Sequence, residues 1–227
     1  MGAAASTAEQ SETGFVVKTC ALSAIATGQK AENLKELLQI LHTIDIDCIY
    51  YHFYGGLLRP RFDDPEYSND FAAWVEHALH DDRLAERLGI IDPARFVDLE
   101  DLRRELIDVI EERLDEQFKT PWSARDEQFY FIRSQIVVLE TGDVLSKPAE
   151  LANAVPKLSL GSIFYHVIDA RRRNADCRDD FCAWLSGLPG QEDLVRDLGD
   201  IDIYFRSLTD LRDRFAETLQ RRLGGAS

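Results

Sequence analysis

The sequence predicts a mainly α-helical protein made of two tandem, related helical bundles packed about a pseudo-two-fold axis. Two observations lead to this fold class. Apolar residues recur at helical spacing over most of the chain, with charged residues between them. In addition, five blocks of the first half return in the same order in the second half, which is typical of a duplicated unit.

The repeated blocks keep a nearly constant spacing. Ile49–Phe53 matches Ile163–Val167 at an offset of 114 residues, and Asn69–Trp74 matches Asp179–Trp184 at an offset of 110. The second copy is therefore shorter in the loop between these blocks. The expected ranges are 1–13 (flexible tail), 14–116 (copy one), 117–127 (linker), 128–223 (copy two) and 224–227 (flexible tail).

Amphipathic helices account for most of each copy. The apolar stripes that predict them run through residues 34–41, 46–57, 71–79, 99–114 and 208–223. N-terminal capping residues support three of these helices: Ser68 or Asn69 before the third stripe, Asp98 before the fourth, and Ser207 before the fifth.

Two segments fit either a helix or a strand. Phe15–Ala26 and Phe129–Leu139 contain β-branched residues, which favour strands, but they stand among predicted helices. We expect both to be helical because of that context, and the strand alternative remains open.

The charge of the chain excludes one large class of partners. The 26 Lys and Arg residues face 41 Asp and Glu residues, so the formal net charge is -15. Nucleic acids and anionic membranes attract clustered positive charge, and we expect neither as a partner. Residues 1–120 carry -12 and residues 121–227 carry -3, and the second part contains one basic cluster, Arg171, Arg172, Arg173 and Arg178. This cluster either binds an anion or contacts the acidic first copy.

The compartment follows from cysteine spacing and from the lack of an apolar segment. The four cysteines form no Cys-x-x-Cys pair and are too sparse for a secreted disulfide framework. The first residues resemble no export signal, and no run of eighteen apolar residues occurs. We expect a cytoplasmic protein with reduced thiols and no membrane span.

Polar residues that recur in both copies are the candidate site. On a helical wheel, His166, Asp169 and Arg173 share one polar flank, and His52 and Arg59 recur at the same offset in copy one. Equivalent aspartates begin the Trp-containing helix of each copy. The candidate ligand-binding residues are His52, Arg59, Asp70, Tyr165, His166, Asp169, Arg172, Arg173 and Asp180. This set suits a carboxylate or phosphate ligand, and it equally suits a buried interhelical network.

No metal or cofactor is expected. His77 and His80 have the spacing of helical metal ligands, but they lie opposite the apolar stripe and have no counterpart in copy two. The sequence contains no P-loop, dinucleotide fingerprint or nucleophile elbow. No catalytic residue is therefore assigned.

The repeated blocks also carry a family resemblance. Ile49–His52, Asn69–Trp74 and Ser162–Arg172 together resemble a bacterial family of unknown function, over nearly the whole chain. In that family a second histidine often follows two residues after the first, where this chain has Tyr54, and the difference argues against a metal site. Similar genes occur beside carbohydrate-active enzymes, so the resemblance implies a carbohydrate-related partner.

Together these features predict a non-enzymatic binding or regulatory protein that uses the groove between the copies. Its expected partner is a protein or an anionic small molecule, and a homo-oligomer remains open. The alternative is an enzyme that acts on an anionic, sugar-like molecule through His, Arg and Asp residues in a pocket between the repeats.

Overall fold

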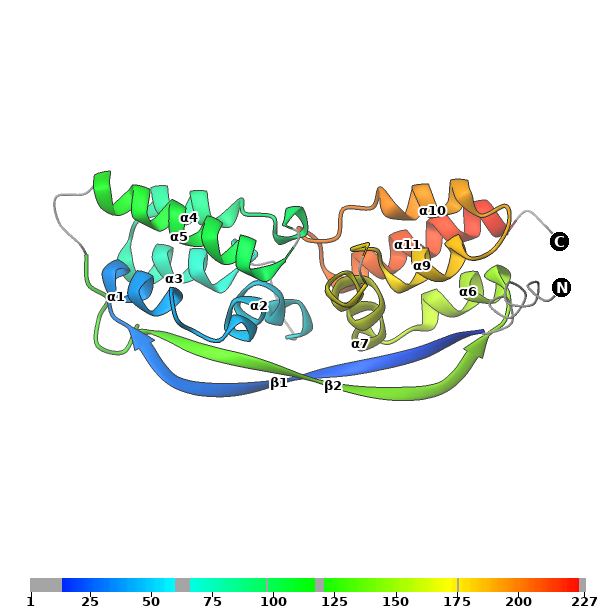
Figure 1. Ribbon diagram of the computed structural model, residues 1–227, viewed down its shortest axis with the longest axis horizontal. Helices are drawn as coiled ribbons and strands as arrows, with labels where there is room; N and C mark the ends of the chain where they lie inside the picture. The colour runs from blue at the N-terminus through cyan, green and yellow to red at the C-terminus, as the bar shows by residue number, and fades with distance from the viewer. Residues whose placement is uncertain (1–13, 60–65, 97, 117–120, 175, 225–227) are drawn as a thin grey trace, which may run out of the picture. The chain divides into compact units, whose positions relative to one another are not determined.

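The computed structural model describes residues 14–59, 66–96, 98–116, 121–174 and 176–224. The chain forms two compact units. Unit 1 comprises residues 1–21 and 138–227, and unit 2 comprises residues 22–137. Within each unit, helices cover one face of a two-stranded β-sheet (Figure 1).

The fold is mixed α/β and rich in helix, so the expectation of a mainly α fold is wrong. The two ambiguous segments are strands, β1 (Phe15–Ala31) and β2 (Phe129–Leu145), rather than helices. Both strands begin with the alternation of a half-buried sheet. Phe15 and Val17 are buried and Val16 is exposed. Alternation of this kind places successive side chains on opposite faces, which a helix cannot do.

The strands run antiparallel. The Thr27 hydroxyl donates to the Phe131 carbonyl at 2.7 Å, and the Thr141 hydroxyl donates to the Val17 carbonyl at 2.9 Å. Partners later in β1 therefore lie earlier in β2. The residue after each threonine is a glycine with positive φ, 78° at Gly28 and 86° at Gly142, a conformation that glycine adopts without strain.

Each strand is divided between the two units. The first part of β1, up to Ala21, belongs to the unit that contains the second-copy helices, and the rest of β1 belongs to the other unit. The boundaries of the compact units therefore differ from the predicted ranges 14–116 and 128–223, because each unit takes in a strand segment from the other range. The predicted tail 1–13, part of the predicted linker and the last three residues lie outside the described residues.

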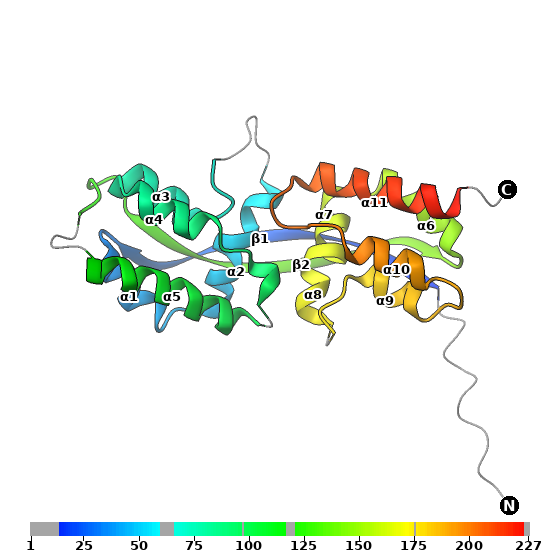
Figure 2. The ribbon, with the colours of Figure 1, turned by 90° about the horizontal axis from the view of Figure 1, so that it is seen from above.

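Unit 2 contains five α-helices in its described part, and their caps explain where two of them begin. The helices are α1 (Leu34–Leu41), α2 (Ile46–Tyr54), α3 (Asp70–Leu79), α4 (Asp82–Gly89) and α5 (Leu99–Glu116), with 3-10 turns at Gly55–Leu58 and Pro93–Arg95. The Asn69 side chain accepts from the Ala72 N–H at 2.9 Å, and the Asp98 side chain accepts from the Asp101 N–H at 2.8 Å. Helix α1 lies against α5, and α3 lies against α4 (Figure 2).

Unit 1 repeats this plan with shorter helices. Its elements are α6 (Pro148–Ala154), a 3-10 turn (Val155–Lys157), α7 (Leu160–Ile163), the π-helix η4 (Phe164–Asp169), α8 (Ala170–Arg173), α9 (Asp180–Ser186), α10 (Glu192–Gly199) and α11 (Leu208–Leu223). The Ser207 side chain caps α11 by accepting from the Asp210 N–H at 3.1 Å, as the sequence predicts. Helix α11 packs against α6 and α10.

The helices and the covered face of the sheet form the core of each unit. The largest fully buried side chains include Phe53 and Phe71 in unit 2 and Phe164, Phe181 and Phe215 in unit 1. None of the helices in the described part of the chain combines the length and the apolar character needed to cross a bilayer.

Candidate functional site

The recurring polar residues form one cluster in each unit. The cluster of unit 1 is centred on His166, which is buried in η4. Its Nδ1 lies 2.8 Å from Asp180 Oδ2, and its Nε2 accepts a hydrogen bond from the backbone N–H of Lys18 at 2.9 Å. Since Nε2 accepts a hydrogen bond, the ring proton is on Nδ1. The Nδ1–H group then donates a hydrogen bond to Asp180. His166 thus connects a helical segment, the first turn of α9 and strand β1.

Arg173 completes this cluster through three bonds. Its Nε lies 2.8 Å from Asp169 Oδ2, and its Nη2 lies 2.9 Å from both Asp180 Oδ2 and the Tyr165 carbonyl. The guanidinium carbon also stands 4.1 Å from the centre of the Tyr165 ring, within cation–π range. Arg172 adds a bond to Asp169 Oδ1 at 3.3 Å. The cluster therefore balances its buried charges internally.

The charge state of Asp180 agrees with this geometry. Burial raises the pKa of a carboxyl group, but the hydrogen bonds from His166 and Arg173 outweigh it, and the pKa of Asp180 lies below its usual value. Asp180 is consequently an ionised acceptor for both neighbours.

The cluster of unit 2 repeats the histidine contacts. His52 in α2 is buried, its Nδ1 lies 2.9 Å from Asp70 Oδ2, and its Nε2 accepts from the backbone N–H of Ile132 at 3.1 Å. Burial lowers the pKa of His52 below its usual value, although Asp70 opposes the shift. The ring is therefore neutral at pH 7. It connects α2 to strand β2, whereas His166 connects its helix to β1.

The arginine of unit 2 is held more loosely. Arg59 Nη2 lies 3.5 Å from Asp70 Oδ2, and its guanidinium carbon is 4.9 Å from the centre of the Tyr51 ring. Where unit 1 has the buried Asp169, unit 2 has Gly55 at the equivalent position, 114 residues earlier. Arg59 consequently lacks a counterpart of that carboxylate, and 43% of its side chain is exposed.

Aromatic residues of the strands seal both histidines from solvent. The Phe15 ring centre lies 4.8 Å from that of His166 and 5.6 Å from that of Trp184. Phe129 makes the equivalent contacts in unit 2, at 4.7 Å from His52 and 5.5 Å from Trp74. Both tryptophans are half-buried, so they contribute to these aromatic groups rather than standing free.

All nine candidate residues belong to these two clusters. Three of them, His52, Arg59 and Asp70, meet in unit 2, and six meet in unit 1: Tyr165, His166, Asp169, Arg172, Arg173 and Asp180. The polar flank expected on the helical wheel is not solvated, because Ser162, His166 and Asp169 are buried. Strand β1, taken as a helix in the sequence prediction, covers this flank.

Three of the four arginines of the basic cluster have ion-pair partners within unit 1. Arg172 and Arg173 pair with Asp169, and Arg178 pairs with Asp176 at 3.3 Å. The charge of these arginines is thus largely compensated by neighbouring aspartates.

Sequence reasoning missed the strand partners of the histidines and the role of two further residues. Asn174 donates to Asp180 Oδ1 at 3.2 Å, and the buried Asp179 caps α9. A usable signal existed for the strand partners, since Lys18 and Ile132 occupy equivalent positions of the repeated blocks. Lys18 and Ile132 bond to the histidines through their backbone N–H groups, however, and the pattern of side chains does not reveal a backbone contact.

Burial also sets the state of two cysteines of the core. Burial raises the pKa of the Cys20 thiol to about 12 and that of Cys48 to about 11, so neither forms a thiolate at neutral pH. His77 and His80 are exposed. Within the residues that the structure describes, no three His, Cys, Asp or Glu side chains are grouped to hold a metal ion.

Comparison with known proteins gives a family without an activity. No curated protein matches the sequence. The solved structure of OrfY from Thermoproteus tenax is 32% identical, with a TM-score of 0.79, and the match covers 93% of this chain and 97% of that chain. The model of a family of unknown function, DUF5752, matches residues 12–220. The chain therefore belongs to the family of unknown function DUF5752.

Proposed function

We propose that this protein is a non-enzymatic cytoplasmic protein that binds a partner protein and thereby regulates or organises it. The observation that carries the proposal is the same in both units: each repeated histidine uses both ring nitrogens in bonds within the protein. A general base needs a nitrogen within reach of substrate. The repeated residues therefore serve the fold.

The charge distribution supports a partner with a basic surface. Unit 2 contains 24 acidic and 13 basic residues, a formal charge of -11, whereas unit 1 has 17 and 13, a charge of -4. Exposed carboxylates of α5, such as Glu105, Asp108 and Glu111, contribute to this acidity. Complementary charge accelerates association and favours basic partners over acidic ones.

Affinity capture with a matched pair of variants tests the proposal. The tagged protein is incubated with native lysate of its source organism, and retained proteins are identified at low and high salt. We expect one stoichiometric protein that is released by salt, because the contact is electrostatic. Neutralising Glu105, Asp108 and Glu111 of α5 should abolish capture. Neutralising Asp213 and Glu217, which are exposed on α11, should leave it unchanged.

The enzyme alternative rests on Arg59, whose guanidinium is half-exposed and makes one long bond to Asp70. Such a group suits the phosphate or carboxylate of a sugar-like substrate. The alternative gains support if phosphorylated or carboxylated sugars raise the melting temperature and Arg59→Gln removes the effect. If no protein is captured and such a shift is seen, the proposal of a protein-binding function fails.

A further inference from the structure

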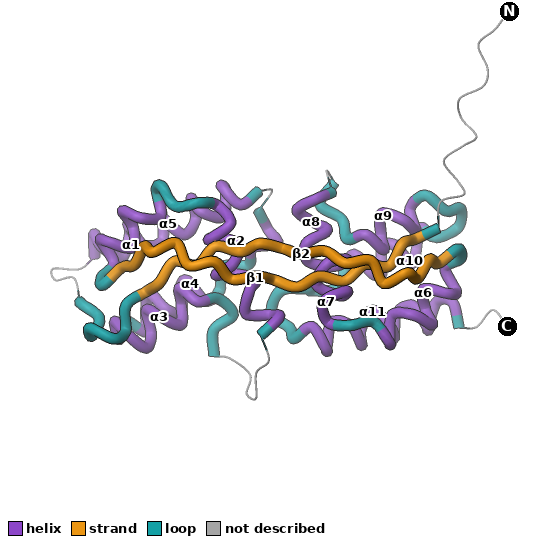
Figure 3. The backbone as a smooth tube through the Cα atoms, turned by 90° about the horizontal axis from the view of Figure 1, so that it is seen from below, coloured by secondary structure: helices purple, strands orange, loops and turns teal. Residues whose placement is uncertain are grey.

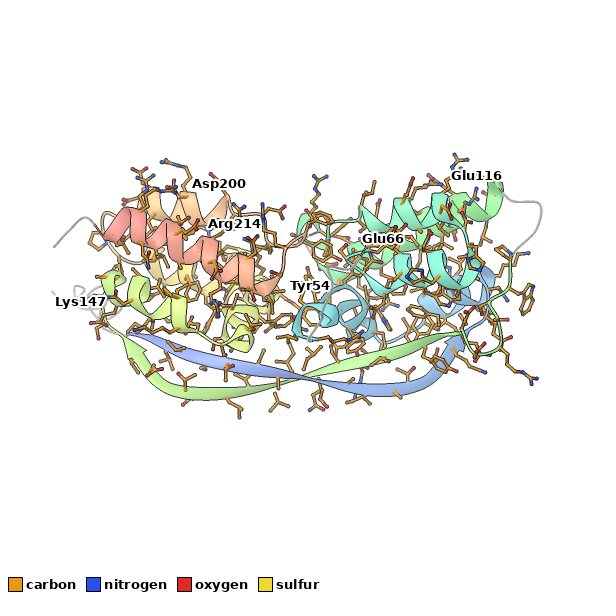
Figure 4. The ribbon with its side chains drawn as sticks, turned by 180° about the vertical axis from the view of Figure 1, so that it is seen from behind. Tyr54, Glu66, Glu116, Lys147, Asp200 and Arg214 are labelled. Carbon is orange, nitrogen blue, oxygen red and sulfur yellow. The ribbon has the colours of Figure 1, made fainter. Side chains whose placement is uncertain are left out.

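Strand β2 is held to the helices of unit 2 from one side. Within this unit, Figure 3 shows that no described helix covers the strands on the side away from the helices. Helix α2, whose end is marked by Tyr54 in Figure 4, lies next to the strands. The Ile132 N–H donates to His52 Nε2 at 3.1 Å, and the Ser134 hydroxyl donates to the Asp47 carbonyl at 3.3 Å. The second distance is long for a hydroxyl donor, so the bond to His52 is the stronger of the two.

The bond between Ile132 and His52 requires a neutral ring. Nε2 accepts this bond only while it carries no proton, because both nitrogens of a protonated imidazole are donors. Nδ1 would keep its bond to Asp70 Oδ2 in the protonated ring. At Nε2, however, two donors would face each other across 3.1 Å. Uptake of a proton therefore makes the contact with the strand repulsive and leaves the contact with α3 in place.

The charged and titratable groups around His52 come from three helical segments. Helix α3 contributes Asp70, which favours a charged ring. Arg59, just after the 3-10 turn that follows α2, opposes a charged ring and lies 3.5 Å from the same aspartate oxygen. On α2 itself, the Tyr51 ring centre is 5.3 Å from that of His52. On α5, Arg103 donates to backbone carbonyls ahead of α2. One carboxylate thus favours the ring charge and one arginine disfavours it.

Strand β2 keeps the ring away from water. Phe129 and Phe131 are buried, and their ring centres lie 4.7 and 6.1 Å from that of His52. Burial lowers the pKa of His52, Asp70 raises it by less, and Arg59 adds to the lowering. A ring that reaches water when the strand moves away regains a pKa near about 6.5. The open state then binds the proton more tightly than the closed state. Below about pH 6.5, and down to the closed-state pKa, each fall in pH therefore favours opening.

We propose that His52 is a pH-sensitive switch: in acid its ring takes up a proton, loses the bond to Ile132 and loosens residues 129–134 of β2 from helix α2. The bond to Asp70 persists, so the ring stays attached to α3 while the strand moves. Loosening gives water access to the rings of Phe129 and Phe131. This inference does not depend on the proposed partner protein.

Amide hydrogen exchange of the full chain, followed by NMR between pH 7 and pH 5, tests the switch. The protection factor is the intrinsic exchange rate divided by the observed rate. We expect that of the Ile132 amide to fall by up to about tenfold per pH unit below about pH 6.5, because opening takes up one proton. The amide of Val75, inside α3, should keep its protection. A constant protection factor at Ile132 overturns the proposal. A parallel fall at Val75 also overturns it, because the whole unit would then be unfolding.

Two variants test whether His52 is the titrating group. His52→Gln offers an amide oxygen as acceptor and does not titrate, so the protection of Ile132 should not change between pH 7 and pH 5. Arg59→Gln removes the cation that opposes the ring charge, at a side chain that is 43% exposed. Its closed-state pKa is higher, so the loss of protection at pH 5 should be smaller than in wild type by about twofold or more. His77→Ala, at an exposed position, is the control and should keep the wild-type pH dependence.

Either variant can contradict the proposal. A His52→Gln chain that loses protection at Ile132 with the wild-type pH dependence shows that another group titrates. An Arg59→Gln chain that loses as much protection as wild type, or more, shows that the charge of the His52 ring does not control the strand.

Discussion

His52 and His166 hold a strand against a helix through both nitrogens of a buried ring. In each case the strand group is a backbone N–H that is bonded to the ring. An unpaired N–H group on an edge strand can bond to a strand of another chain. The histidine ring occupies this N–H group and so prevents that contact. The aspartate orients the ring by accepting the hydrogen bond that Nδ1–H donates. At this scale the histidines resemble the His–Asp pairs of catalytic sites, but the nitrogen that would transfer a proton is occupied.

Replacing either histidine should therefore cost stability. We expect His166→Ala and His52→Ala each to lower the free energy of unfolding by about 2–4 kcal/mol, because two hydrogen bonds and a buried ring are lost. Urea denaturation measures the change. His77→Ala, at an exposed position within helix α3, should change stability by less than about 0.5 kcal/mol. Unchanged stability of the His166 variant would instead fit a catalytic histidine that the fold does not need.

A second residue-level prediction concerns the helix cap Asp179. Burial raises the pKa of Asp179 above its usual value. In unit 2 the equivalent cap is Asn69, whose Nδ2 donates to the Leu88 carbonyl at 2.9 Å, a bond that an ionised carboxylate cannot make. Because the folded pKa is raised, the protonated carboxyl stabilises the fold below about pH 4, and this contribution is lost as pH rises through the folded pKa.

Asp179→Asn should consequently stabilise the protein at pH 7, by about 1–3 kcal/mol, with no gain below about pH 4. Asn69→Asp should do the reverse in unit 2. Denaturation curves of both variants between pH 4 and pH 8 measure the effect. An Asp179→Asn variant that is less stable than wild type at pH 7 would show that the ionised carboxylate is favourable there.

The candidate residues could be predicted from the sequence because similar blocks of residues occur in both halves of the chain. His52 and Asp70 in the first half correspond to His166 and Asp180 in the second half, so the pattern points to the same residue types twice. The sequence could not reveal that the histidines are buried. Their burial depends on the segments that cover them, which are strands β1 and β2, and the sequence predicts these two segments as helices.

Among the elements, the helices were predictable and the strands were not. The expected helices at 34–41 and 99–114 are confirmed as α1 and α5, since long amphipathic stripes report a buried face directly. Strand β1 alternates clearly only at its beginning, and small or polar residues make up most of the remainder. Without large apolar residues at every second position, the rest of the strand gives no period-two signal in the sequence.

The contact between β1 and α7 yields a prediction for a single glycine. A Cβ added at Gly161 would lie 2.4 Å from the Cys20 carbonyl oxygen and 2.7 Å from Thr19 Oγ1. Gly161→Ala should push the strand away from the helix and lower the free energy of unfolding by about 1–3 kcal/mol. Gly199→Ala is the control, since nothing lies within 4 Å of its added Cβ. Equal urea midpoints for the two variants would contradict the close approach of β1.

On the scale of the whole molecule, each unit depends on residues from distant parts of the chain. Unit 1 takes Phe15 and Lys18 from the first strand, although its helices all follow residue 147. The predicted ranges divide the chain into two consecutive segments, whereas each compact unit contains part of both strands. Local sequence patterns cannot show which strand segment packs on which group of helices, because both strands have similar sequences and the contact is between distant residues.

Removing residues 1–21 should therefore affect distant helices selectively. We expect amides of η4 and α9 to exchange hydrogen faster in the truncated chain, because the backbone donor to His166 and the Phe15 ring are lost. Amides of α3 should keep their protection, since that helix packs within unit 2. Hydrogen exchange with mass spectrometry resolves these segments. Uniform loss of protection, or loss confined to α3, would contradict the assignment of β1 to unit 1.

The position of the ring proton in the two buried histidines is the sharpest test of their structural role. Nitrogen-15 NMR of the imidazole rings at pH 7 reports which nitrogen carries the proton. We expect both His52 and His166 to carry a single ring proton on Nδ1, because Nε2 accepts the strand N–H. The exposed His80 serves as an internal reference. Protonation of Nε2 in either buried ring would contradict the account, because that nitrogen could not accept the strand bond and would be available for other chemistry.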